Sequence, residues 1–403
     1  MDVNLNYENG ADEAPLDESI LEQRALTSTL NSFLVYCKAG RYNLTESRRR
    51  AYQNLSDRHR SLLSSFYTDH LNAVDNALNA NAEFLNMVVT IAANEFEAPQ
   101  DKSEWDGATG IQVEHVKSTI KQIFRDWSRE GAPERAVCYG PVIEALNGLF
   151  SSDIRRSKRV LVPGAGLGRL AYDIACEGYF SQGNEFSYHM LVMSNFLLNH
   201  TTTTSEYTIY PFVHNFSHTS RGANQVRPIV IPDVCPSTHD ISTTENFSFC
   251  AGSFTDVYGR KEMLDDEVEE KWDAIATVFF IDTAHNVLDY IDTISYALSE
   301  DSTSYWINFG PLLYHFEDQQ SEATLNGPSD VENLSIELPL DKLVQVIEDS
   351  GFVFEALRTG IKTTYAADDR ALGRWVYDSV FWVARKRRPG EEFTSFVDEI
   401  PTR

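Results

Sequence analysis

A glycine-rich turn after a short apolar run constrains the fold of this chain most strongly. Residues 160–162, Val-Leu-Val, lead through Pro163 into the sequence GAGLG at residues 164–168, and a stretch with helical spacing follows. An apolar strand that ends in closely spaced glycines and continues into a helix is typical of nucleotide-binding α/β folds, because glycine lets the backbone approach a ligand closely. The sequence therefore predicts a strand–turn–helix unit with a ligand site at the turn.

The glycine spacing helps to separate two classes of ligand. A dinucleotide fingerprint requires GxGxxG, and its third glycine position is occupied here by Arg169. Glu185 follows Gly168 by 17 residues, where the second strand should end, and a carboxylate at that place can accept hydrogen bonds from ribose hydroxyls. We therefore favour S-adenosylmethionine over a nicotinamide or flavin dinucleotide. A purely structural glycine turn and NAD-dependent reduction stay open as alternatives.

Hydrophobic periodicity divides the chain into three parts. Residues 1–18 are polar and acidic and predict a disordered tail, and residues 19–150 have a helical period throughout. From residue 151 to residue 403, strands alternate with helices, which predicts a mainly parallel sheet. Two insertions, near 201–246 and 256–271, are expected to lie at the surface.

The end of the chain refines this prediction. The segments FVFEALRT and SVFWVARK, residues 352–359 and 379–386, predict a closing antiparallel pair of strands. An antiparallel final strand is typical of class I methyltransferases. The expected architecture is an α/β, Rossmann-like class I methyltransferase fold with an all-α N-terminal region.

Composition narrows the function. The formal net charge of −26 argues against nucleic acid as a partner, because phosphate contacts need clusters of Lys and Arg. The five cysteines are scattered without a CxxC pair, which predicts neither a disulfide framework nor a metal site and favours a reducing compartment. We find no apolar run of the ~18 residues that span a bilayer, and we expect no signal or transit peptide. We expect a cytoplasmic protein, with the nucleus as an alternative, that needs no membrane partner.

Three long motifs resemble the carnosine N-methyltransferase family. They are VLVPGAGLGRLAYDIACEGYFSQGNEFSYHMLVMSNFLLN, FFIDTAHNVLDYIDTI and WINFGPLLYHF, at residues 160–199, 279–294 and 306–316. The resemblance extends over residues 115 to 386. It implies transfer of a methyl group from S-adenosylmethionine to the imidazole of β-alanyl-histidine (carnosine), which gives anserine. The family is also connected with methylation of histidine in proteins, and it suggests a homodimer formed through the helical region.

The resemblance implies a set of cofactor-binding residues. Gly164 and Gly166 would bring backbone beside the methionine moiety, and Glu185 would hold the ribose. Gln122 and Arg125 lie three residues apart on one face of a predicted helix. In the family this pair reaches the cofactor, where Arg125 would bind the methionine carboxylate; a solvent-facing helix pair is the alternative.

One cofactor motif departs from the family pattern. The family has Ala-Gly-Asp-Phe after its third strand, with the acid near the adenine, whereas this chain has Ala-Gly-Ser253-Phe254. Ser253 can still form a hydrogen bond, and Asp256 is a candidate to replace the missing acid. Val278, at the tip of the fourth strand, would contact the adenine or the methyl group.

The acceptor residues are expected at the ends of neighbouring strands. Asp282 follows a buried strand, where its role is either substrate binding or capping of the next helix. His315 follows the fifth strand, and a lone histidine there is either structural or in contact with substrate. Tyr377 would flank the pocket from the last strand. Trp375 would lie on the same strand face, at a position where the family usually has tyrosine.

An imidazole acceptor explains the choice of these side chains. With a pKa near ~6.5, imidazole is mostly neutral at pH 7 and already nucleophilic. The Asp282 carboxylate would accept one ring N–H, aim the other nitrogen at the methyl donor and stabilise the imidazolium that forms. His315 would share this role or hold the peptide part. We also expect an acidic pocket that attracts the ammonium end of the dipeptide.

Two alternatives stay open for the function. A protein-histidine methyltransferase would use the same chemistry on a larger acceptor. A methyltransferase-like module without catalysis is the second, because of the departures at Ser253 and Trp375, although Glu185, Asp282 and His315 argue against it.

Overall fold

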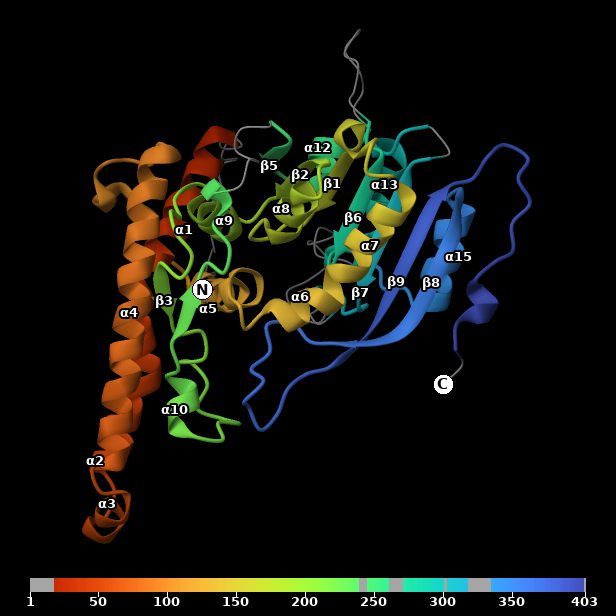
Figure 1. Ribbon diagram of the computed structural model, residues 1–403. Helices are drawn as coiled ribbons and strands as arrows, with labels where there is room; N and C mark the ends of the chain where they lie inside the picture. The colour runs from red at the N-terminus through yellow and green to blue at the C-terminus, as the bar shows by residue number, and fades with distance from the viewer. Residues whose placement is uncertain (1–17, 239–244, 261–270, 301–302, 318–334, 402–403) are drawn as a thin grey trace, which may run out of the picture.

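The computed structural model describes residues 18–238, 245–260, 271–300, 303–317 and 335–401. A helical region stands beside a twisted sheet that has helices on both faces (Figure 1). The predicted tail lies outside the described residues, apart from Glu18, where the first helix begins. The helical region contains α1 (Glu18–Gly40), the π-helical turn η1 (Arg41–Glu46), α2 (Ser47–Gln53), α3 (Asp57–Leu63), α4 (Phe66–Glu95), α5 (Gly110–Trp127), α6 (Ala132–Cys138) and α7 (Gly140–Leu149).

The sheet has seven strands in the order β5-β2-β1-β6-β7-β9-β8. The first five in this order pair in parallel, and β9 is antiparallel to both of its neighbours. The antiparallel pair predicted from the last segments is thus present, and the class I methyltransferase fold is confirmed. The strands are β1 (Arg159–Pro163), β2 (Phe180–Glu185), β5 (Phe247–Ala251), β6 (Ala274–Val278), β7 (Tyr305–Gly310), β8 (Phe352–Thr363) and β9 (Tyr377–Lys386).

Helices cover both faces of the sheet, so its central strands are apolar on both sides. Successive side chains of β1 point to opposite faces. Val160 and Val162 pack with α7 and with α8 (Arg169–Cys176), whereas Leu161 packs with α13 (Val287–Ala297) and α15 (Leu340–Asp349). This packing explains the continuous apolar run that precedes the glycine turn.

The insertion at 201–246 differs from our expectation of a surface segment. It contains β3 (Tyr207–Ile209) and β4 (Ile229–Ile231), which pair in antiparallel fashion, and the short helix α10 (Gly222–Gln225). Ile209 and Ile231 are fully buried in one core with α1, α4, α5 and α9 (Tyr188–Asn199). Polar residues interrupt the apolar positions in this segment, so the sequence hides the buried hairpin. Most of the other insertion, at 256–271, lies outside the described residues.

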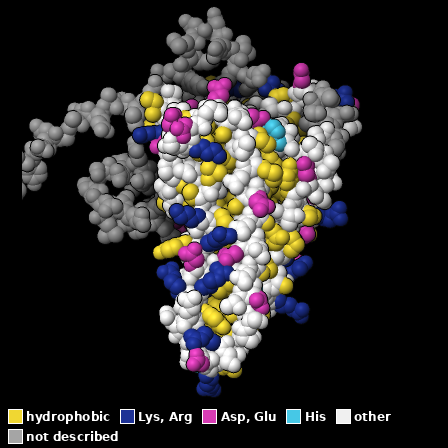
Figure 2. All heavy atoms as spheres, turned by 90° about the vertical axis from the view of Figure 1, so that its left-hand side faces the viewer, with side chains coloured by type: hydrophobic (Ala, Val, Ile, Leu, Met, Phe, Trp, Pro, Cys, Tyr) yellow, Lys and Arg dark blue, Asp and Glu magenta, His cyan; other side chains and the backbone are white. Residues whose placement is uncertain are grey.

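The outer face of the helical region is chemically mixed. Figure 2 shows hydrophobic side chains there between Lys and Arg on one hand and Asp and Glu on the other. Leu62, Phe66 and Met87 are exposed on α3 and α4. Among the helices of the described residues, none is both long and apolar enough to cross a membrane.

Candidate active site

The glycine turn has the left-handed backbone that its composition predicts. Gly164, Gly166 and Gly168 have φ values of 61°, 55° and 78°, which favour glycine over other residues. A Cβ atom on Gly164 would lie 2.4 Å from the ring of Phe280. The backbone N–H of Ala165 donates to the carbonyl of Asn184 at 2.9 Å and ties the turn to β2.

Glu185, the last residue of β2, points its carboxylate at this turn. Oε2 accepts the backbone N–H of Gly166 at 2.9 Å, and Oε1 accepts those of Phe186 and Ser187 at the same distance. The side chain is buried, and burial raises its pKa although the three N–H donors oppose the shift. Glu185 therefore organises the turn directly.

A cavity of about 600 Å³, here called the glycine-loop cavity, opens beside this turn. It contains a stack of Phe280 on Tyr290, with ring centroids 4.6 Å apart and the edge of Phe254 against both rings. Asp256 is exposed and does not line the cavity, so it does not replace the missing acid. The predicted residues that do line the cavity are Gln122, Gly164, Gly166, Glu185, Ser253, Phe254 and His315.

Arg125 lies at the inner end of this region and is buried, not solvent-facing. Its Nε donates to Glu134 at 2.9 Å, and its Nη1 donates to Asp126 at 3.0 Å and to the hydroxyl of Tyr139 at 2.8 Å. Within the described chain, its Nη2 is buried without a hydrogen-bond partner. A small chamber joins Arg125 to the glycine turn, with Gln122 and Val278 in its wall.

A second cavity, of about 290 Å³, lies at the tips of β6 and β7. We call it the strand-tip cavity. Asp282, His315 and Tyr377 line it together, as the sequence predicted, and Gln122 lines it as well as the glycine-loop cavity. The backbone of His315 donates to the carbonyl of Asp282 at 3.1 Å.

Asp282 does not cap the following helix. Asn286 caps α13 by accepting the backbone N–H of Leu288 at 3.1 Å. The Oδ2 atom of Asp282 instead accepts the N–H of Leu313 at 2.9 Å. Burial raises the pKa of Asp282, and both this N–H and the nearby His315 oppose the shift.

Trp375 does not lie where the sequence predicted. It precedes β9, which begins at Tyr377, and it is 72% exposed. The alternation of side chains along a strand therefore does not apply to this pair, although their ring centroids are 6.4 Å apart. Trp375 lines a neighbouring groove and not the strand-tip cavity.

Comparison with known proteins connects this geometry with a family. The carnosine N-methyltransferase family matches residues 102–388. The carnosine N-methyltransferase of Schizosaccharomyces pombe is 41% identical over 375 residues, which cover 91% of this chain and 97% of that protein. The chain belongs to the carnosine N-methyltransferase family. The enzyme of that name from Rattus norvegicus is 39% identical, over 92% of this chain and 88% of that protein.

Solved structures resemble the chain more distantly. Phosphoethanolamine N-methyltransferase 2 of Haemonchus contortus, in complex with S-adenosyl-L-methionine, is 10% identical with a TM-score of 0.37. The likeness covers 69% of this chain and 58% of that one. All of the site residues predicted from the sequence fall inside the range matched by the carnosine N-methyltransferase family.

Among the residues of the strand-tip cavity that sequence reasoning missed are Lys121, Phe279 and Tyr365. The ring of Phe279 lies 5.1 Å from that of Tyr365, and the guanidinium of Arg125 lies 4.7 Å from the Tyr365 ring. Phe279 has a φ of 52°, a strained value for this residue type. Tyr365 comes from the connection between β8 and β9, where no periodic pattern marks it. The sequence position of Lys121 could have identified it as a candidate, because it directly precedes the predicted site residue Gln122.

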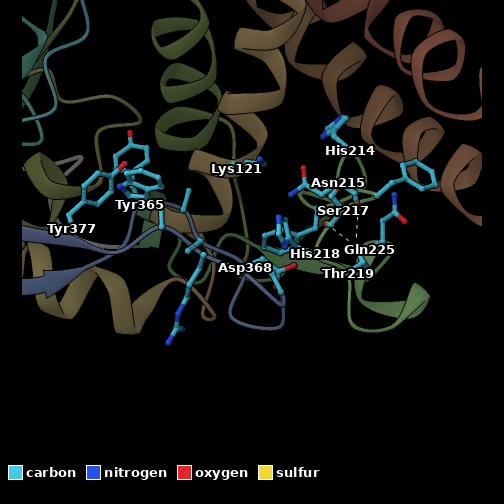
Figure 3. Close-up of a pocket in the computed structure, with 18 of the residues that line it drawn as sticks. Lys121, His214, Asn215, Ser217, His218, Thr219, Gln225, Tyr365, Asp368 and Tyr377 are labelled. Atoms are coloured by element: carbon cyan, nitrogen blue, oxygen red, sulfur yellow. Dashed lines mark hydrogen bonds between the residues drawn. The ribbon is translucent and has the colours of Figure 1, made fainter. Parts of the chain in front are cut away.

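The strand-tip cavity is not predominantly acidic, contrary to our expectation, whereas the glycine-loop cavity is lined by the acids Glu185 and Asp289. Asp282 and Lys121 are the acid and the cation that line the strand-tip cavity. A groove of about 490 Å³ adjoins it, lined mainly by residues 214–219 and 365–368, and we call it the outer groove (Figure 3). Asp368 is the acid in its lining, against Arg48, Lys121 and Arg374. The strand-tip cavity and the outer groove therefore carry no excess of acids.

Proposed function

We propose that this protein is an S-adenosylmethionine-dependent N-methyltransferase that acts on the imidazole of carnosine and produces anserine. Family membership supports the reaction class. The main support for the proposal is that Asp282 and His315 line the same cavity. Gln122 lines both this cavity and the glycine-loop cavity. A carboxylate and an imidazole thereby stand next to the place where a methyl donor would bind.

The residues present fit S-adenosylmethionine. The buried, unpaired Nη2 of Arg125 is a donor suited to the methionine carboxylate. Three of the roughly four acceptor positions of the Glu185 carboxylate are used by backbone N–H groups, which leaves about one for a ribose hydroxyl. The full proposed set is Gln122, Arg125, Gly164, Gly166, Glu185, Ser253, Phe254 and Val278.

S-adenosylmethionine, when bound, supplies an electrophilic methyl group on a sulfonium. The protein's part is to orient the acceptor. Because Oδ2 of Asp282 is held by the N–H of Leu313, the carboxylate has a fixed direction in the cavity. It would accept one imidazole N–H, so that the lone pair of the other ring nitrogen faces the donor. The carboxylate also balances the positive charge that develops on the imidazole.

His315 and Tyr377 complete the proposed acceptor site. His315 lines both the strand-tip and the glycine-loop cavity, so it stands at their junction. Tyr377 lines the strand-tip cavity together with Phe279, whose ring centroid lies 6.1 Å away. Trp375 would contact only the part of an acceptor that extends into the outer groove.

Incubation of the purified protein with labelled S-adenosylmethionine tests the proposal. Carnosine, other histidine dipeptides and histidine-containing proteins are compared as acceptors. We expect efficient methylation of carnosine. A protein-histidine methyltransferase, the second candidate, would instead label proteins and leave dipeptides unmodified. Cofactor binding without transfer to any acceptor would indicate a non-catalytic module and contradict the proposal.

We also propose a homodimer formed through the helical region. The exposed apolar side chains of Leu62, Phe66 and Met87 support it, because burial of such groups favours association. Sedimentation equilibrium would measure the mass directly. A monomer at micromolar concentration would contradict this proposal, and Phe66→Ser should weaken a dimer without changing the fold of a monomer.

A reducing location is proposed for the protein. All five cysteines are free thiols, which supports the cytoplasm, with the nucleus as the alternative. Fractionation of cells that produce the native protein would separate the two.

A further inference from the structure

Lys121, at the mouth of the strand-tip cavity, is a cation without a partner among the residues that the structure describes. It lies on α5 directly before Gln122, is half-buried, and lines both this cavity and the outer groove. Its ammonium forms no hydrogen bond or ion pair with any described residue. The acids nearest to it are engaged elsewhere, since Glu114 pairs with Lys117 and Asp368 pairs with Arg227.

The position of Lys121 joins two surfaces. In Figure 3 it stands on its helix between Tyr365 and Tyr377 on one side and His214 and Asn215 on the other. A ligand whose ring enters the strand-tip cavity would therefore pass Lys121 on its way out to the groove. A partly buried ammonium favours an anionic group at this place.

His214 provides a second hydrogen-bond donor near Lys121, and a chain of hydrogen bonds determines which of its ring nitrogens carries the proton. The amide of Asn81 is oriented by the backbone of Tyr210, which it contacts through both Oδ1 and Nδ2. Its Nδ2 donates to the hydroxyl of Tyr36, and among the described residues Nε2 of His214, 2.7 Å from that hydroxyl, is the acceptor within reach of the hydroxyl proton.

This chain fixes the tautomer of His214. Because Nε2 accepts, a neutral His214 carries its proton on Nδ1. Burial and the nearby positive charges of Lys117 and Lys121 lower the pKa of His214 to about 3, which keeps the ring neutral. Nδ1 has no hydrogen-bond partner in the described part of the chain. Among the described residues, an N–H donor and an ammonium without partners thus both belong to side chains that line the outer groove.

We propose that Lys121, assisted by His214, binds the α-carboxylate of the acceptor and so selects a C-terminal histidine. The proposal rests on the proposed function, in which the acceptor ring lies against Asp282. In carnosine the imidazole and the carboxylate belong to the same residue, so both lie within a few ångströms of each other. A histidine inside a protein has a neutral amide at that place, which can accept a hydrogen bond from Lys121 but cannot form an ion pair with it. The site therefore discriminates against internal histidine.

Steady-state kinetics of Lys121→Met with two acceptors test the proposal. One acceptor is carnosine and the other is β-alanylhistamine, which has the same ring and amine but no carboxylate. We expect the KM for carnosine to rise about ten-fold or more, because the loss of a hydrogen bond to a charged group typically weakens binding by at least that factor. The KM for β-alanylhistamine should stay unchanged, and Lys121→Arg should retain the preference for carnosine.

Lys117→Met is the matched control, because Lys117 lies one turn earlier on α5 and pairs with Glu114 outside both cavities. It should leave both KM values unchanged. An equal ratio of the two KM values in the wild type and in Lys121→Met would overturn the proposal. Titration calorimetry of both acceptors against the wild-type protein adds a readout that needs no turnover. Equal affinity for them would likewise overturn it, whereas failure of the proposed function would appear as binding of carnosine without methylation.

Discussion

The backbone N–H of His315 lies 3.1 Å from the carbonyl oxygen of Asp282 and donates to it. This hydrogen bond joins the segments that follow β6 and β7. Because the N–H of Leu313 also donates to the Asp282 side chain, both the backbone and the carboxylate of Asp282 are held by the same neighbouring segment. The relative position of the two proposed acceptor-binding residues is therefore built into the fold before any ligand binds.

Asp282→Asn should abolish most of the transfer. The amide oxygen can still accept the N–H of Leu313, but the amide group carries no negative charge to stabilise an imidazolium. We expect kcat/KM for carnosine to fall about 100-fold or more. Asp282→Ala should abolish transfer. In both variants the affinity for S-adenosylmethionine, measured by calorimetry, should stay within a factor of two or so of the wild type. Near-wild-type turnover in either variant would reject the role.

Glu185→Gln should weaken cofactor binding. An amide offers one oxygen, so it cannot accept from Gly166 on one side and from Phe186 and Ser187 on the other. We expect the Kd for S-adenosylmethionine to rise about ten-fold or more, with thermal denaturation as a check on folding. Glu185→Ala should have a larger effect, because it leaves all three N–H groups without this acceptor. An unchanged Kd would contradict the proposed ribose contact.

Gly164→Ala should destabilise the protein, whereas Gly148→Ala should not. At Gly164 a Cβ atom meets the Phe280 ring at 2.4 Å, and φ is 61°. We expect a loss of about 2–4 kcal/mol in the free energy of unfolding. Gly148 lies in α7 with no atom within 4 Å of the added Cβ, so alanine there should be neutral or stabilising by up to about 1 kcal/mol. Urea denaturation measures both, and equal effects would refute this view of the turn.

Stability should fall below pH 6.5 because of His189. Burial, and then the neighbouring His115, lower the pKa of His189 from 6.5 to about 4. Between these values the unfolded chain binds a proton that the folded chain excludes, so stability is lost as the pH falls. From pH 7 to pH 5 this amounts to about 2 kcal/mol. Urea unfolding at both pH values measures the loss.

His189→Gln should remove this part of the pH dependence, and His59→Gln, a change at an exposed position, should leave it intact. The same slope in wild type and His189→Gln would show that other groups are responsible.

Features that are determined by residues close together in the sequence could be predicted from it. The glycine turn needs positive φ at fixed positions, and Glu185 follows where β2 ends, so both are local patterns. The closing strands β8 and β9 are long segments rich in apolar residues. Asp282 and His315 each follow a strand, and the parallel pairing of β6 with β7 brings their tips together. The class I fold followed from these elements.

Features that depend on distant packing could not be predicted. Tyr365 reaches the strand-tip cavity from a connection without periodicity, and the position of Trp375 depends on where β9 begins. That Lys121 has no ion-pair partner among the described residues can be recognised only when the partners of Glu114 and Asp368 are known. Ile209 and Ile231 look like isolated apolar residues until they meet helices far away in the chain.

The hairpin β3–β4 has a consequence for the synthesis of the protein. Helices α1, α4 and α5 share one apolar core with residues as late as Ile231. These helices leave the ribosome well before the hairpin that covers them, and chains generally acquire structure in the order in which they are made. The apolar side chains of the nascent helices, such as Leu30, Phe33 and Leu85, therefore stay uncovered until translation has passed residue 231. During this time they must be kept from aggregating. A fragment that stops near residue 150 would expose this apolar surface permanently and should require a chaperone to stay in solution.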